Sequence, residues 1–194
     1  MTKIRDRLFA GLVLVLILRT CAMSAAEGET AYRNERWGFC ISYPSGWSAD
    51  EATNKAGIEV NAPPSLHPRA TITVGALPNQ PKTLDDPAAP DTGDWMSLDD
   101  VVRRQLDALR AYLPEPAGKS VRLIRRQRTE FGGVPAISTE VAYVEGRTEK
   151  LDETLWFIKE HAVYSLVLKC DRASRSKYEP VFKRVVGSFR AGCK

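Results

Sequence analysis

The chain has 194 residues, 43% of them hydrophobic and 27% charged, and a formal net charge of +4. Four basic residues and one acidic residue lie within residues 1–26, so the rest of the chain carries a charge of only +1. A segment of this length suits one domain with a real core, and its near-neutral charge excludes the overall basic surface that drives binding to nucleic acid or anionic lipid.

Residues 1–26 show the order of features of a secretory signal peptide. Basic residues precede an apolar run at 8–18, and Ser24-Ala25-Ala26 supplies the small residues that signal peptidase reads. The apolar run is too short for a membrane-spanning helix of the mature protein. We therefore expect cleavage after Ala26 and export to the periplasm or the cell exterior, with residues 27–194 as a single domain.

Two other fates of this N-terminus stay open. One is a retained N-terminal anchor. The other is a lipid anchor on Cys21. In that route a lipoprotein peptidase would cleave the chain just before Cys21, and the cysteine would be acylated. The preceding Leu18-Arg19-Thr20 is a poor match to that signal, because the peptidase prefers small uncharged residues there.

The first predicted elements after the leader are β-strands. Asn34-Glu35 is prone to form a turn, and apolar residues alternate over Trp37–Tyr43, so we predict a hairpin whose second strand stops at Pro44. Two further runs of alternating residues, Ile58–Asn61 and Arg69–Leu77, predict two more strands.

The segment from Pro78 to Met96 has a different composition, with several prolines and aspartates and no periodicity. Long segments of this kind are usually mobile or functional. Its aspartates do not fit an EF-hand, because Gly93 and Trp95 occupy ligand positions in a loop that starts at Asp91. A helix with an apolar stripe is predicted to follow, beginning at a capping box and ending at Pro114.

Four strand-like runs dominate the second half of the chain. Short turn-forming pairs separate them, and connections this short join antiparallel strands. The runs are Val121–Glu130, Val134–Val144, Thr148–Lys159 and Ala162–Cys170.

A final amphipathic helix is predicted after Asp171 or Ser174, either of which can cap it. Its apolar residues recur at steps of three and four and must pack on another element. The apolar face of the four-stranded meander is the nearest candidate, so we predict a layered α+β domain. The stripe consists of Tyr178, Val181, Phe182, Val185, Val186 and Phe189.

Three cysteines remain after residue 26: Cys40, Cys170 and Cys193. An exported protein can form one disulfide from these and keep one free thiol. Because the predicted helix would separate Cys170 from Cys193 by about 20 Å, a bond between Cys40 and Cys193 is the better prediction. A chain without a disulfide remains the alternative.

The stretch Gly38-Phe39-Cys40-Ile41-Ser42-Tyr43-Pro44-Ser45-Gly46-Trp47, with a last helix that ends in Val185-Val186-Gly187-Ser188-Phe189, resembles the PsbP-like superfamily. Bacterial members include DcrB-like and LpqN-like envelope proteins. The resemblance implies an α-β-α sandwich with a mainly antiparallel sheet and a non-enzymatic role. Relatives stabilise a photosystem assembly, bind a small GTPase or act as chaperones, and they share no set of functional residues.

The densest basic run is the main candidate for a binding surface. On a regular strand, Arg122, Arg126 and Arg128 share one face with Ile124, and Arg125 points the other way. These residues form a cationic stripe that could dock an acidic partner, or a charged surface that protects the sheet from aggregation. Trp95, in the Pro/Asp-rich segment, is the other candidate contact.

The sequence predicts no catalytic, metal or cofactor site. Its two histidines, His67 and His161, are too few and too isolated for a zinc site, and both are expected in solvated loops. Ser45 lacks the glycine that precedes the serine of a nucleophile elbow. We expect an exported, non-enzymatic protein that binds another envelope protein, or alternatively carries a small apolar or lipid-like ligand in a cleft between helix and sheet.

Overall fold

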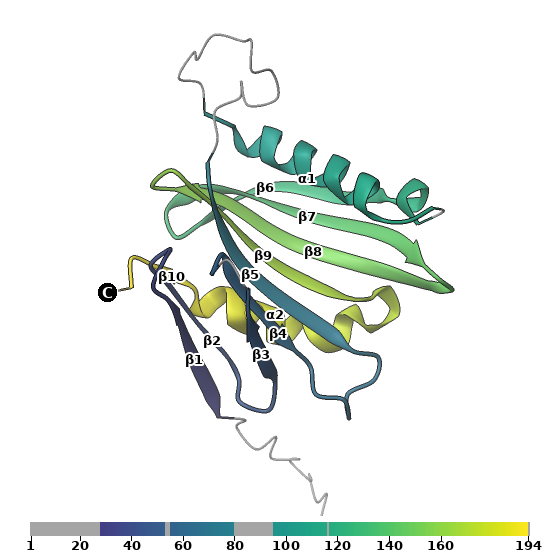
Figure 1. The fold of residues 1–194 in the computed structure, drawn as a ribbon, viewed down its shortest axis with the longest axis horizontal. Coiled ribbons are helices and arrows are strands. Elements are labelled where there is room, and N and C mark those ends of the chain that lie inside the picture. The colour runs from purple at the N-terminus through teal and green to yellow at the C-terminus, as the bar shows by residue number, and fades with distance from the viewer. Residues whose placement is uncertain (1–27, 53–54, 80–94, 116, 194) are drawn as a thin grey trace, which may run out of the picture.

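The computed structural model describes residues 28–52, 55–79, 95–115 and 117–193, and Figure 1 shows how their elements are arranged. A seven-stranded antiparallel sheet in the order β3-β4-β5-β9-β8-β7-β6 forms the middle layer. A smaller sheet has the order β1-β2-β10. The strands are β1 (Glu29–Asn34), β2 (Phe39–Pro44), β3 (Ser48–Glu51), β4 (Gly57–Asn61), β5 (Ala70–Pro78), β6 (Arg122–Phe131), β7 (Val134–Glu145), β8 (Thr148–Lys159), β9 (Ala162–Asp171) and β10 (Arg190–Ala191).

The predicted meander is confirmed as β6–β9, with every boundary within one residue of the predicted position. Its turns need the left-handed backbone that glycine adopts without steric cost. Gly132, Gly133 and Gly146 have φ values of 58°, 79° and 63°. At the third turn, Glu160 and His161 adopt φ values of 50° and 64°.

The helices α1 (Leu98–Tyr112) and α2 (Arg175–Ser188) cover opposite faces of the large sheet (Figure 1). Side chains on a strand alternate between faces, so each central strand serves both layers. On β9, Leu166 and Leu168 join the core beneath α2, whereas Val163 packs with Val101 and Val102 of α1. The α-β-α sandwich is thereby confirmed.

Helix α2 buries Tyr178, Phe182 and Val185 of its predicted stripe. The core beneath it extends beyond the meander, because β2, β4 and β5 also contribute. The earlier prediction that the meander supplies this surface is therefore incomplete. These strands add Phe39, Ile41, Ile58, Val60, Ile72 and Val74.

The N-terminal hairpin is confirmed as β1 and β2, which pair from Asn34 and Phe39 at the turn to Glu29 and Pro44. The other edge of β2 pairs with β10, directly after α2. This pairing brings Cys193 to Cys40, and a disulfide joins them across a Cα–Cα distance of 6.0 Å. Cys170, at the end of β9, is a buried free thiol.

Helix α1 begins at the predicted capping box. The Asp100 N–H donates to the Ser97 hydroxyl at 3.2 Å, and the Ser97 N–H donates to the Asp100 carboxylate at 3.1 Å. After the helix, the 3-10 turn η2 (Gly118–Ser120) leads into β6. This turn needs glycine at 118, because a Cβ there would lie 2.5 Å from the Arg110 carbonyl oxygen.

Two short strands were not predicted. All four residues of β3 are exposed, and its sequence Ser-Ala-Asp-Glu lacks the alternation of a half-buried strand. β10 has only two residues. Pairing with a neighbouring strand, rather than local propensity, specifies both.

Several sequence predictions lie outside the described residues. These are the signal peptide at 1–26 with Cys21, and most of the Pro/Asp-rich segment, at 80–94. A search of the described parts of the chain finds no helix that is long and apolar enough to cross a membrane.

Candidate functional site

Strand β6 is an edge of the large sheet. Within the described ranges only β7 pairs with it, so its outer row of backbone N–H and C=O groups is open. All residues from Arg122 to Glu130 are exposed, including Leu123 and Ile124 at 40% and 41%. An open edge of ten residues contrasts with the short edge strands by which proteins prevent unwanted pairing.

A β-bulge interrupts β6 at Ile124. Leu123 pairs with Val141, and Arg125 pairs with the adjacent Glu140, so Ile124 has no partner on β7. The extra residue reverses the alternation of faces along the strand. As a result, Leu123 faces the α1 side of the sheet and Arg125 faces the α2 side.

Because of the bulge, the arginines of β6 do not lie on the faces predicted from the sequence. Arg126 and Arg128 both reach Asp99 in the first turn of α1, and the Arg128 Nη2 lies 2.6 Å from Asp99 Oδ2. Arg122 instead contacts Glu149, at 2.6 Å, on the α2 side. The prediction that Arg122 shares a face with Arg126 and Arg128 is wrong, because strict alternation fails across a bulge.

The carboxylates near β6 are shared between arginines. Glu149 contacts Arg172 as well as Arg122, and Glu140 contacts both Arg125 and Arg175 of α2. Asp99 is likewise shared by two arginines of β6. The groups at Glu149 and Asp99 each hold two arginines and one carboxylate. The group at Glu140 is balanced, because Arg175 also contacts Glu153 and Glu179, and Glu179 contacts Lys183. The Arg128 side chain is 77% exposed.

A groove of about 330 Å³ runs between α1 and β6. Its apolar part comes from Val102 and Leu106 of the helix and Leu123 of the strand. Charged side chains of both signs form the rest of its lining. They are Asp99, Asp100, Arg103, Asp107, Arg110 and Arg126. An apolar strip beside charged groups and an open strand edge is suited to bind a polypeptide segment.

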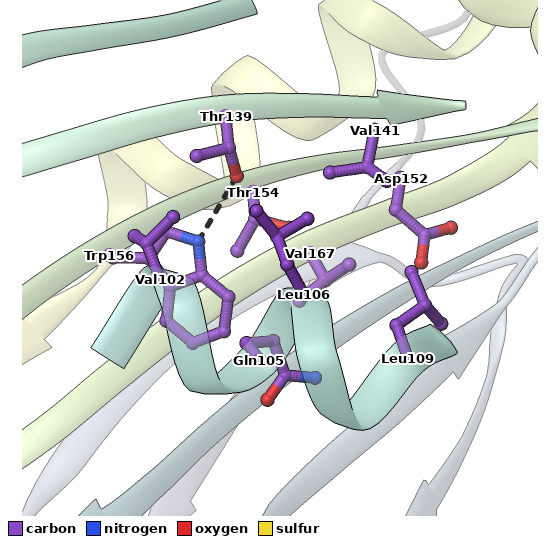
Figure 2. A pocket seen from close by; sticks show the side chains of 10 residues that line it. All are labelled: Val102, Gln105, Leu106, Leu109, Thr139, Val141, Asp152, Thr154, Trp156 and Val167. Carbon is purple, nitrogen blue, oxygen red and sulfur yellow. Dashed lines mark hydrogen bonds between the residues drawn. The ribbon is translucent and has the colours of Figure 1, made fainter. Parts of the chain in front are cut away.

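A smaller cavity, of about 60 Å³, lies deeper between α1 and the sheet (Figure 2). Polar side chains of Gln105, Thr139, Asp152 and Thr154 line it together with apolar ones. The Trp156 indole N–H donates to the Thr139 hydroxyl at 3.2 Å, shown as the dashed line in Figure 2. The cavity has room for water-sized molecules, whereas small-molecule sites typically need about 300–1,000 Å³.

Asp152 is the main titratable group of this cavity. Burial raises its pKa to about 6, and the positive charge of Lys169 opposes that effect. The Tyr143 hydroxyl lies 3.3 Å away and donates a hydrogen bond to the carboxylate. Burial and the charge of Asp152 also raise the pKa of Tyr143. Asp152 can therefore exchange a proton near neutral pH. The sequence signal that could have located this group is that Asp152 shares one face of its strand with Thr154 and Trp156.

Trp95 lies apart from Arg122. Its ring is 5.3 Å from that of His161, at the turn between β8 and β9, and it is 48% exposed. Arg122 lies toward the opposite ends of the strands, paired with Ala142 of β7. Trp95 therefore lies near the turn between β8 and β9, whereas Arg122 lies at the far end of the edge strand β6. The two sequence candidates do not form one site.

A hollow of about 310 Å³ lies between the β6–β7 hairpin and the C-terminal strand. Phe131, Phe157 and Phe189 form its aromatic lining, with Lys159 and Arg190 beside them. The three rings also contact one another, with centroids 5.0–6.0 Å apart. Sequence reasoning did not identify this hollow, because its rings come from three separate segments.

The described residues contain no group of three or more His, Cys, Asp and Glu that could hold a metal ion. His67 and His161 are both exposed and lie outside the helices and strands, as predicted. The candidate site consists of the groove and the cavity beside α1. Sequence reasoning missed the apolar floor of the groove, and it also missed Asp99 and Asp152.

The sequence matches the PsbP family over residues 27–191. No curated protein matches it. Among solved structures, the solution structure of cyanobacterial PsbP (CyanoP) from Synechocystis sp. PCC 6803 has a TM-score of 0.60 at 14% identity. That match covers 90% of this chain and 98% of CyanoP.

Two further solved structures are similar. The Ran-binding protein Mog1p of Saccharomyces cerevisiae has a TM-score of 0.52 at 8% identity, with 86% of this chain and 97% of Mog1p covered. LpqN, involved in cell envelope biogenesis of Mycobacterium tuberculosis, has a TM-score of 0.47 at 14% identity, with 84% and 89% covered. At these identities the similarity shows the fold alone, and the likeness to LpqN supports no further inference.

Proposed function

Because the chain belongs to the PsbP family, we propose that it is an exported, non-enzymatic factor that works by binding another protein of the cell envelope. Members of this family are generally binding proteins without catalytic activity. The observation that carries the proposal is the groove between α1 and the open edge of β6.

The lining of this groove supports binding to a protein. Interfaces combine an apolar centre with a polar rim, and arginine is enriched in them. Val102, Leu106 and Leu123 would form the apolar centre, and Arg126 lies at the rim with the acidic residues of α1. Trp95, exposed at the start of the α1 layer, is a second candidate contact.

The proposed export is supported by two features. Residues 1–26 have the order of a signal peptide, and the disulfide between Cys40 and Cys193 suits an oxidising compartment. The mass of the mature protein tests this part of the proposal. A mass equal to that of residues 27–194 supports cleavage after Ala26. A mass equal to that of residues 21–194 plus a diacylglycerol would identify a lipoprotein.

Site-specific photocrosslinking tests the binding surface. A photoreactive residue replaces Leu123 in the groove, and in a control protein it replaces Lys183, an exposed residue of α2. We expect one stoichiometric partner from an envelope extract to crosslink at position 123 and not at 183. The same set of proteins at both positions would reject the groove as a specific site. A third photoreactive protein, changed at Trp95, tests that contact separately.

Carriage of a small apolar or lipid-like ligand is a second candidate function, favoured by the aromatic hollow at Phe131, Phe157 and Phe189. Its volume of about 310 Å³ falls within the range of ligand sites. Native mass spectrometry with palmitate as the probe tests this function. A Val134→Asp variant, changed in the lining of the hollow, should lose the adduct. Failure of the wild-type protein to bind palmitate would count against carriage of fatty acids.

A further inference from the structure

We propose that the partner binds by strand addition, with an extended acidic segment paired to the free edge of β6 and alternate side chains in the groove beside α1. This inference rests on the proposed protein-binding function and specifies the chemistry of the partner.

The backbone of β6 supplies the first part of the argument. A strand at the edge of a sheet presents unpaired N–H and C=O groups, and an extended peptide can continue the ladder at a spacing of about 4.8 Å. The bulge at Ile124 disturbs pairing locally. Regular pairing is therefore available from Arg125 to Phe131, a length that suits a short peptide strand.

The groove supplies the second part. Every second side chain of an added strand would point to the α1 side of the sheet. There it would meet the apolar floor formed by Val102, Leu106 and Leu123. Backbone hydrogen bonds would provide affinity and this strip would select the alternate side chains, as in other complexes formed by strand addition.

Charge identifies the partner as acidic. The charged residues of β6 are four arginines and one glutamate. The carboxylates near the arginines, Glu140 and Glu149 on the α2 side and Asp99 at α1, are each shared between two arginines. The positive charge of the edge therefore comes from β6 itself, and it favours an added strand that carries Asp or Glu.

The same arginines explain why the edge can stay open without self-association. Charged side chains on an edge strand prevent pairing with like-charged strands, including β6 of a second copy of this chain. An acidic strand meets no such repulsion. Edge protection and partner selection are thus two effects of one set of residues.

Short synthetic peptides test strand addition. The probe is a peptide of about nine residues with alternating Glu and Val and blocked ends, added to the ¹⁵N-labelled domain. We expect shifts and slower hydrogen exchange for β6 amides, from Arg125 to Phe131. A Lys/Val peptide should bind at least about tenfold more weakly. A Glu/Val peptide with alternate N-methyl groups should also lose about tenfold, because it cannot complete the ladder.

Two protein variants complete the test. Val side chains in the groove place the Glu side chains on the α2 side, where Arg125 lies, so Arg125→Glu should weaken binding of the Glu/Val peptide by about tenfold. The control Arg184→Glu reverses an exposed charge on α2 and should leave binding unchanged. Equal binding of all three peptides, or shifts centred on α2 or β3, would overturn the proposal. An edge-to-edge dimer of the domain, seen as a doubled mass in solution, would overturn it as well.

The two proposals fail in different ways. A partner crosslinked at position 123, together with peptides that leave β6 unperturbed, would keep protein binding at the groove and reject strand addition. An acidic peptide that protects β6, with no partner crosslinked at position 123, would support the edge chemistry and reject the proposed function.

Discussion

The two faces of the large sheet differ in how completely they are packed. Beneath α2, one continuous core includes closely packed aromatic residues, with Phe157 stacked on Tyr164 and Phe189 on Phe39. The α1 side has two smaller clusters, and of the helix itself only Val101 and Val102 are buried. A cavity and a half-buried carboxylate, that of Asp152, lie under that helix.

Under the proposed function, this difference assigns stability and recognition to opposite faces. The α2 face excludes water and fixes the fold, so changes there should cost much free energy of unfolding. The α1 face is thinly packed and ends at an open edge, so its side chains can change at lower cost. A binding surface can therefore diversify on the α1 side while the fold persists.

Loss of the disulfide should have the largest effect. Cys40→Ser frees a loop of 153 residues and removes a bond that holds the α2 layer, so we expect a loss of about 2–5 kcal/mol in the free energy of unfolding. Urea unfolding of the variant and of reduced wild-type protein measures it. A Cys170→Ala variant controls for the loss of a thiol outside the bond. A loss below about 1 kcal/mol would contradict the importance of this layer.

The same substitution in both helices compares the faces directly. Val185 of α2 is fully buried, whereas Val102 of α1 is buried but borders the cavity and the groove. Val185→Ala should cost about 2–3 kcal/mol and Val102→Ala about 1 kcal/mol, because fewer contacts are lost at 102. Urea unfolding compares the two variants. Equal losses would mean that the faces are equally well packed.

Asp152 makes the α1 side sensitive to pH. Its folded-state pKa of about 6 lies above the value of 3.8 for the unfolded chain, so the native state holds this proton more tightly. The penalty of its charge is absent below about pH 4, grows between pH 4 and 6 and is complete above pH 6. Asp152→Asn should therefore stabilise the protein by about 1–2 kcal/mol at pH 7.5 and by little at pH 4.

Urea unfolding at both pH values measures this effect. Asn keeps an oxygen that can accept the Tyr143 hydrogen bond, so the variant removes the charge and preserves the contact. A gain of the same size at both pH values would show that packing, and not the charge, is responsible.

The smallest change in stability is expected at the proposed binding residues. Arg128→Gln breaks an exposed ion pair with Asp99, which also contacts Arg126, so the free energy of unfolding should fall by less than about 0.5 kcal/mol. Thermal unfolding measures it. A loss above about 1 kcal/mol would assign this arginine to stability and remove the separation between the two faces.

Regular patterns made most of the fold predictable. Alternation and turn residues located β6–β9, and Ser97 with Asp100 located the start of α1. The site was less predictable, because it depends on departures from regularity. One unpaired residue, Ile124, moves Arg122 to the other face, and nothing in the local sequence distinguishes it from its neighbours. The groove floor likewise joins Val102 and Leu123, whose proximity only the tertiary fold creates.

The bond between Cys40 and Cys193 turns nearly the whole domain into a covalent ring, with a sequence separation of 153 residues. A protease that cuts the backbone once between these residues opens the ring without releasing either fragment. The cut protein would keep its full mass on a non-reducing gel and separate into two pieces only after reduction. In the proposed location outside the cytoplasm, a single proteolytic cut would therefore leave both helices and both sheets attached.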